Sequence, residues 1–198
     1  AINQFFASGV VYTYRLEPVT ATFIDPTLHA PWNDPANWDG GVVPSTGDAA
    51  IVPAGMYPEI GAGVVSTVDT LEVAGQLRIR GDLSVETSTT IASGATVDLQ
   101  STARFDPSGT VTLDGLLNNG GPVVIDGPGT ISGTGRFIND DELRKTGSGT
   151  LTLGPGVVWT SRSYSELNVV AGAVEIQGPL FDDNVGSGIS DDVTAGTF

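Results

Sequence analysis

Oxygen-bearing side chains gather near the C-terminus, where they could bind a divalent cation. They are Asp182, Asp183, Asn184, Asp191 and Asp192, with glycines between the two groups. Calcium takes six to eight oxygen ligands, commonly carboxylates and backbone carbonyls on a tight loop. The spacing matches neither an EF-hand nor a glycine-aspartate nonapeptide. We treat this set as a candidate calcium site and Asp140 with Asp141 as a second one, while a solvated acidic loop is the simpler alternative.

Two tryptophans, Trp32 and Trp38, could form a platform for sugars, since aromatic rings cover the apolar faces of pyranoses. The alternative is a structural cap, in which the rings shield one end of an apolar core. In that case Asn37, Asp39 and Asp48 would hydrogen-bond loop backbone rather than a ligand.

Catalysis would need two or three carboxylates that converge on one face, one protonated and one ionised. Asp98, Asp114 and the pair Asp140-Asp141 are the candidates. Only one histidine, His29, is present, and the short intervals between apolar residues leave little chain for substrate loops. We therefore expect no enzymatic activity, with a polysaccharide lyase or hydrolase as the alternative.

The spacing of threonine and apolar residues predicts the architecture that must position these groups. Threonines occur every 20 residues, each followed by an apolar residue, at Thr70-Leu71, Thr90-Ile91, Thr110-Val111, Thr130-Ile131 and Thr150-Leu151. The same interval separates Leu77, Val97, Leu117, Phe137 and Val157. A fixed period indicates a coiled chain in which equivalent residues stack on successive turns. We expect the five apolar residues after the threonines to form a single interior column.

Within one turn the apolar positions are Leu71, Leu77, Leu83 and Ile91, in steps of 6, 6 and 8. Local alternation of polar and apolar residues is typical of strands, and no stretch has the 3.6-residue period of a helix. The sequence therefore predicts an all-β, right-handed parallel β-helix with about 20 residues and three short strands per turn, capped at its N-terminal end. Six turns would run from Ile51 to Val174, with about three extra residues near 161–165.

The threonine columns suggest one further surface. Outward Thr-x-Thr rows on a β-solenoid can order water, as in ice-binding proteins. The second column predicted here is Glu72, Ala92, Thr112, Ser132 and Thr152. That column is neither uniform nor free of charge, and threonine is common on exposed strand faces. Ice binding is therefore the weaker interpretation.

Three regions are expected: an N-terminal strand and aromatic capping segment (1–49), the solenoid (50–178) and an acidic tail (179–198). The segment 2–16 is rich in β-forming apolar residues, which include Phe5, Phe6, Val10, Val11, Tyr12 and Tyr14. An apolar strand outside the repeat must be covered. It could cap its own first turn or contact another subunit, because an open strand edge invites pairing.

Composition limits the classes of partner. The net charge is −15 and only eight residues are Lys or Arg, so phosphate backbones and anionic membrane surfaces are disfavoured. No apolar run reaches 18 residues, which argues against membrane insertion. The chain has no cysteine, which removes disulfides and thiol chemistry from consideration.

Two segments resemble known extracellular proteins. Residues 32–52, WNDPANWDGGVVPSTGDAAIV, resemble the segment that opens many bacterial extracellular β-helix proteins. Residues 145–153, KTGSGTLTL, and 169–176, VVAGAVEI, are similar to the passenger repeat of autotransporter adhesins. The resemblance implies a secreted or surface-displayed right-handed β-helix.

These observations lead to one expected function and two alternatives. We expect a secreted structural protein, a rigid building block of a surface adhesin or extracellular filament with contacts between identical subunits. Other partners could be cell-surface glycans, and calcium is the one candidate cofactor. The alternatives are a carbohydrate-binding module that uses Trp32 and Trp38 and a polysaccharide-degrading enzyme.

Overall fold

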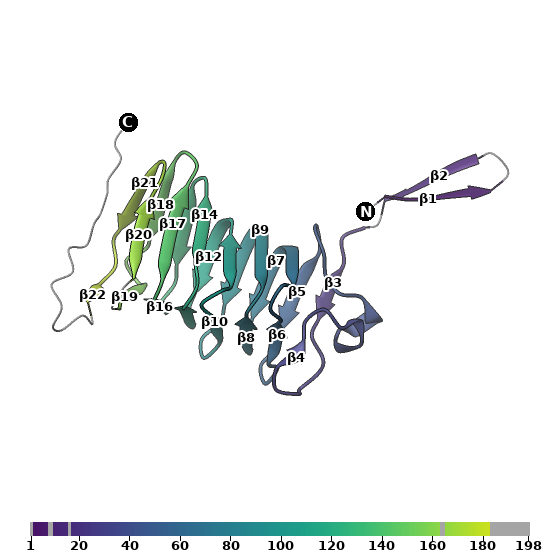
Figure 1. Ribbon diagram of the computed structural model, residues 1–198, viewed down its shortest axis with the longest axis horizontal. Helices are drawn as coiled ribbons and strands as arrows, with labels where there is room; N and C mark the ends of the chain where they lie inside the picture. The colour runs from purple at the N-terminus through teal and green to yellow at the C-terminus, as the bar shows by residue number, and fades with distance from the viewer. Residues whose placement is uncertain (1, 8–9, 16, 163–164, 183–198) are drawn as a thin grey trace.

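The computed structural model describes residues 2–7, 10–15, 17–162 and 165–182, with side chains for 17–162 and 165–181. Nearly all regular structure is β, as expected, and the strands of the main body stack as a β-solenoid (Figure 1). None of the helices in these ranges is long and apolar enough to cross a membrane.

One side of the solenoid is an eight-stranded parallel sheet, called the first face. Its strands, from the N-terminal end, are β4 (Ala30–Pro31), β6 (Pro58–Ile60), β8 (Gln76–Ile79), β10 (Thr96–Leu99), β13 (Leu116–Asn119), β16 (Arg136–Asn139), β19 (Val158–Ser161) and β22 (Leu180–Asp182). Leu77, Val97, Leu117 and Phe137 pair in register, which confirms the 20-residue interval on this face.

A bent twelve-stranded sheet supplies the other two sides. The long strands β7 (Val65–Val73) and β9 (Asp82–Ile91) cross the bend between them. The second face continues with β11 (Arg104–Pro107), β14 (Val123–Asp126), β17 (Glu142–Thr146) and β20 (Glu166–Val169). The third face has β3 (Thr20–Thr22), β5 (Ala49–Val52), β12 (Gly109–Leu113), β15 (Gly129–Ser132), β18 (Thr150–Leu153) and β21 (Ala173–Ile176). Three strands per turn are thus confirmed.

The predicted interior column on the third face was wrong in its register. The five residues of the predicted column are all buried: Leu71, Ile91, Val111, Ile131 and Leu151. However, Leu71 pairs with Thr89 rather than Ile91, and Ile131 pairs with Leu153 rather than Leu151. On the first face, likewise, Phe137 pairs with Trp159 rather than Val157. A shift of two residues keeps the same side chains pointing inward, so alternation alone cannot detect it.

The threonine columns shift with this register. The observed outward column is Thr70, Ser88, Thr110, Thr130 and Thr152, and its neighbour is Glu72, Thr90, Thr112 and Ser132. The two columns contain eight hydroxyl side chains, as many as predicted, with Ser88 in place of Thr150. Glu72 still places a charge at one end.

The parallel ladder extends beyond residues 50–178 at both ends. β3 pairs with β5 and β4 with β6, so 20–49 contain strands of an additional turn, and β22 pairs with β19. At the N-terminal end Ile51 pairs with Glu72, and Ala50 is the residue that faces Leu71. At the other end Val174 pairs with Leu151, which confirms the predicted 23-residue interval.

Two short 3-10 helices, η1 (Pro35–Asn37) and η2 (Asp39–Gly41), lie between β4 and β5. Before the solenoid, β1 (Ile2–Ala7) and β2 (Val10–Arg15) form an antiparallel hairpin that pairs with no other described strand. Figure 1 shows this hairpin beyond β3, apart from the stacked strands.

Candidate functional site

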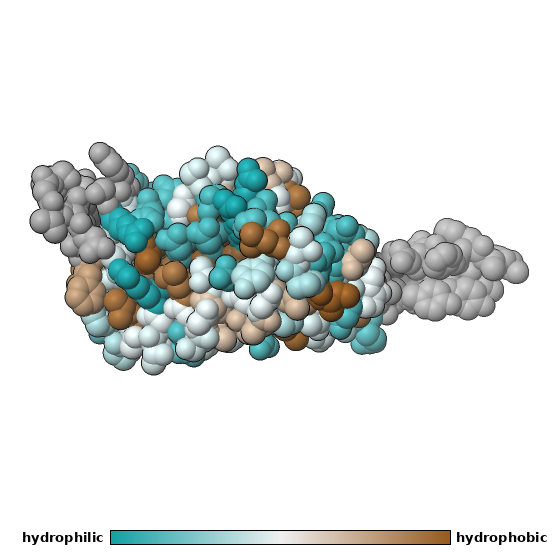
Figure 2. Space-filling model, turned by 90° about the horizontal axis from the view of Figure 1, so that it is seen from below, coloured by the Kyte–Doolittle hydropathy of each residue, from teal (hydrophilic) through white to brown (hydrophobic). Residues whose placement is uncertain are grey.

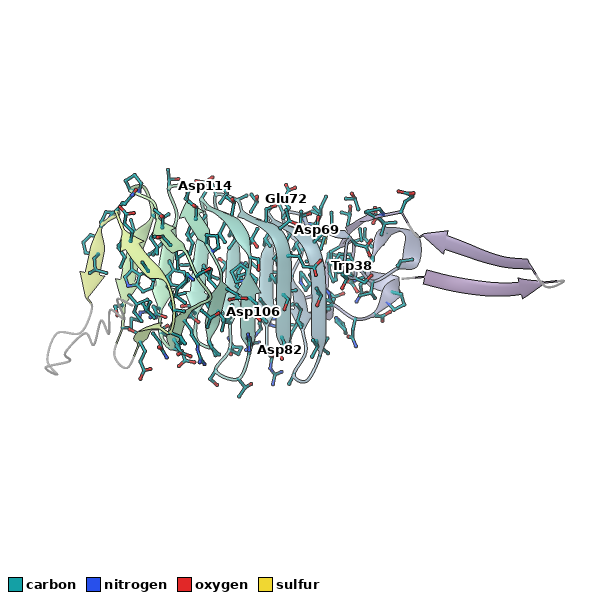
Figure 3. The ribbon with its side chains drawn as sticks, turned by 90° about the horizontal axis from the view of Figure 1, so that it is seen from above. Trp38, Asp69, Glu72, Asp82, Asp106 and Asp114 are labelled. Carbon is teal, nitrogen blue, oxygen red and sulfur yellow. The ribbon has the colours of Figure 1, made fainter. Side chains whose placement is uncertain are left out.

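The tryptophans form the predicted cap. Trp32 and Trp38 are 0% and 1% exposed, and their rings meet edge to face at 4.6 Å between centroids. Phe23 contacts Trp38 at 5.1 Å, and the indole Nε1 of Trp38 donates a 2.7 Å hydrogen bond to the Trp32 carbonyl. Figure 3 places Trp38 at the N-terminal end of the solenoid. The sugar platform on these residues was wrong, because no ring face is open to solvent.

The polar residues of the cap hold loop backbone, as expected. Asn37 donates from Nδ2 to the Pro31 carbonyl, and Asp39 accepts from the amide of Thr22 at 2.6 Å. Asp48 accepts from the amides of Val19 and Ser45, both at 3.0 Å. Partial burial opposes ionisation of Asp48, but these hydrogen bonds outweigh it and lower the pKa of the carboxyl.

Most of the candidate calcium ligands, Asp183, Asn184, Asp191 and Asp192, lie outside the described residues, and Asp182 is described only as the last backbone position of β22. Within the described ranges no group of three or more His, Cys, Asp or Glu side chains comes together. At the second candidate, Asp140 forms a 2.9 Å ion pair with Arg162. Burial, aided by the charge of Glu142, raises the pKa of Asp141.

The expected subunit-contact residues, Phe5, Phe6, Val10, Val11, Tyr12 and Tyr14, all fall in the β1–β2 hairpin, where Phe5 lies opposite Tyr12. Their side chains lie outside the described residues, so these contacts stay predictions.

The candidate catalytic carboxylates are spread along the molecule. Of these candidates Figure 3 labels Asp114, which lies along the same side of the solenoid as Asp69 and Glu72, whereas Asp82 and Asp106 lie along the other side. Asp98 accepts hydrogen bonds from Gln100 at 2.6 Å and Asn118 at 2.8 Å. Asp114 accepts from the amide and hydroxyl of Thr134. Asp98 and Asp114 therefore form hydrogen bonds that connect neighbouring turns.

A cluster around Glu59 was missed by sequence reasoning. The Glu59 carboxylate lies 3.3 Å from Arg80, 3.7 Å from Arg78 and 3.7 Å from Nδ1 of His29. His29 has a left-handed backbone (φ 61°), which is uncommon for a residue other than glycine. The only histidine is a signal in the sequence, but its partners become visible only when the fold brings β6 and β8 together.

Beside this cluster lies a hollow of about 220 Å³, called the His29 hollow. It is lined by side chains of β8 and β10, by His29 before β4 and by Tyr57 before β6; the polar residues among them include Gln76, Arg78, Thr96 and Asp98. A second hollow of about 560 Å³, the Phe181 hollow, is lined by residues that include Asp114, Thr134, Arg136, Thr160 and Phe181. Both lie along the outer side of the first face.

Lys145 is buried in the second face. Its ammonium group is 0% exposed and donates to the carbonyls of Thr146 and Gly147. Burial lowers the pKa of this lysine, although the charge of Asp126 acts in the opposite direction. No binding or chemical role follows from this position, because the amine is closed off from solvent.

Comparison with protein-family models finds no match to this chain, and comparison with the curated proteins and with the solved structures finds none either.

Proposed function

We propose that this chain is a secreted structural protein, a rigid β-solenoid building block of a surface adhesin or extracellular filament. The observation that carries the proposal is the parallel ladder, which runs from β3 and β4 to β21 and β22 with a buried aliphatic core along its length. Hydrogen bonds between successive turns resist stretching and bending of such a rod. The role is mechanical, and the described carboxylates that hold adjacent turns support it.

The N-terminal hairpin is the segment that we propose for contact between subunits. The solenoid already has its own cap of Phe23, Trp32 and Trp38, so the hairpin is not needed there. Its strands pair only with each other among the described strands, which leaves two outer edges available for pairing. At the opposite end, Leu180 of β22 is more than half exposed. Both ends of the rod thus offer surfaces that a second copy could cover.

An extracellular location is part of the proposal. It is supported by the resemblance of residues 32–52 and 145–176 to extracellular β-helix proteins. The net charge of −15 is compatible with a rod that stays dispersed outside the cell.

Sedimentation velocity and electron microscopy test the proposal. The full chain should form dimers or filaments, and a chain that lacks residues 1–16 should sediment as a monomer. A full-length variant with Phe5→Asp and Tyr12→Asp serves as the matched control, because it keeps the length of the hairpin. Measurements with and without a calcium chelator report whether the acidic C-terminal residues contribute. Equal sedimentation of all three proteins would contradict the assembly role.

A further inference from the structure

The His29 and Phe181 hollows share one composition. Each has an aromatic side chain, an arginine, an aspartate and at least one threonine: Tyr57, Arg78, Asp98 and Thr96 in the first, and Phe181, Arg136, Asp114 and Thr134 in the second. Aromatic rings cover the apolar face of a sugar ring. Carboxylates accept hydrogen bonds from sugar hydroxyls, and guanidinium groups donate to them. The repeated set therefore fits sugar units.

The two hollows lie in line along the solenoid axis. Gln76, Thr96, Leu116, Arg136 and Val158 stand in register, each at the start of its strand on the first face. Gln76 and Thr96 line the His29 hollow, whereas Arg136 and Val158 line the Phe181 hollow. From Gln76 to Arg136 there are three strand spacings, or roughly 14 Å. One short oligosaccharide could therefore occupy both hollows.

Between the hollows the surface is neither strongly charged nor uniformly apolar. Leu116 and Asn118 are half-buried there. Figure 2, which views the molecule from below Figure 1, shows hydrophilic and hydrophobic side chains interspersed. Such a mixed surface suits a chain of sugars, whose rings have apolar faces and polar edges.

The polar groups of both hollows are held in place before any ligand binds. Arg78 donates to Gln100 at 3.2 Å and lies against Glu59, and Asp98 is held by Gln100 and Asn118. In the second hollow, Arg136 donates from Nε to the Thr160 hydroxyl at 3.0 Å. Fixed side chains lose little conformational freedom on binding, which favours affinity for a weakly interacting ligand.

The negative net charge of the protein favours uncharged polysaccharides over acidic ones. Each hollow is lined by one arginine and one aspartate, so neither has a large excess of positive charge. The whole chain carries a net charge of −15, which repels acidic polymers at long range. An uncharged polysaccharide avoids that repulsion.

We propose that the outer side of the first face binds an uncharged polysaccharide along the solenoid axis, with one sugar unit in the His29 hollow and another in the Phe181 hollow. This site goes beyond the structural role and does not depend on self-assembly. It would give a building block of an adhesin its contact with a glycan surface.

The test uses the full chain in native gels that contain hydroxyethyl cellulose, galactomannan, xylan or laminarin, with pectate as the acidic counterpart. At least one uncharged polymer should slow migration, and pectate should not. Calorimetry with the hexasaccharide and disaccharide of that polymer should show binding of the hexasaccharide at least tenfold tighter, because only the longer ligand reaches both hollows. Sedimentation of the same samples reports assembly separately.

Two variants locate the site. Phe181→Ala removes a side chain that is 54% exposed, and Arg78→Gln removes one guanidinium; each should weaken hexasaccharide binding about tenfold. Arg104→Gln is the matched control, since Arg104 pairs with Asp106 on the second face. Thermal unfolding of each variant checks that it is folded. Failure of every uncharged polymer to bind, tighter binding of pectate, or unchanged affinity in the Phe181→Ala and Arg78→Gln proteins would overturn the proposal.

Discussion

Asn119 donates a 2.6 Å hydrogen bond from Nδ2 to Oδ1 of Asn139, its equivalent on the next turn. Both side chains are almost fully buried, at the corner between the first and second faces. Asn119 also donates to the carbonyl of Glu142, and Asn139 donates to that of Glu166, both at 3.1 Å. The stacked amides thus connect successive turns at this corner.

Replacement of Asn139 by alanine should destabilise the protein. The Glu166 carbonyl would lose its side-chain donor in a corner closed to solvent, at a cost of about 1–3 kcal/mol. Urea unfolding of Asn139→Ala measures this loss. The control is Asn118→Ala, since Asn118 is half-buried and donates to Asp98 on the outer side. An equal loss in both variants would show that burial of the corner amide has no special weight.

Gly121→Ala should be strongly destabilising for steric reasons. A Cβ atom at Gly121 would lie 2.5 Å from the carbonyl oxygens of both Ala103 and Gln100, which belong to the backbone of the preceding turn. Since the backbone must move, we expect a loss of about 2–3 kcal/mol. At Gly61 the nearest atom is a Val64 methyl at 3.8 Å, so Gly61→Ala should be nearly neutral. Thermal melts of the pair decide, and similar melting temperatures would refute the close approach of turns at Gly121.

Lys145→Met should remove a pH-dependent part of the stability, because it deletes a buried amine that carries a charge and donates to the carbonyls of Thr146 and Gly147. The pKa of Lys145 is lowered in the fold from its ordinary 10.5, so the folded state binds fewer protons than the unfolded chain between the two values. Wild-type stability should therefore rise with pH across that window relative to the stability of the variant.

The measurement for Lys145 is the difference in urea midpoint between the two proteins from pH 7 to pH 10.5, with Arg144→Met as an exposed control. A difference that stays constant with pH would contradict the lowered pKa of Lys145.

Trp38→Ala should loosen the N-terminal end of the solenoid. The change removes contacts with Phe23 and Trp32 and a hydrogen bond to the Trp32 carbonyl, so the expected cost is about 3–5 kcal/mol. Hydrogen exchange should rise first in β3 to β6 and less in β16 to β19, since each turn of a solenoid depends mainly on its neighbours. Val42→Ala, at an exposed position nearby, is the control. Uniform loss of protection along the whole chain would instead indicate a single cooperative unit.

Much of the architecture followed from local pattern. The steps between Leu71, Leu77 and Leu83 predicted three strands per turn, because an inward side chain must recur once on each face of a narrow core. The 20-residue interval on the first face was confirmed from Leu77 to Phe137. The cap was also predictable, since large aromatic rings such as Trp38 outside the repeat have few other places to be buried.

The sequence by itself determined that the chain winds into a parallel β-solenoid, because strand alternation and a long-range period are both properties of residue order. Only the tertiary structure decided which residues lie side by side. Leu71 meets Thr89 rather than Ile91, and a slip of two residues preserves every inward side chain, so alternation cannot reveal it. The register of β7 against β9 shifts between Val68 and Thr70, just before Leu71. His29, Glu59 and Arg78 also come together only in the folded chain. They lie on separate turns, and no local pattern in the sequence relates them.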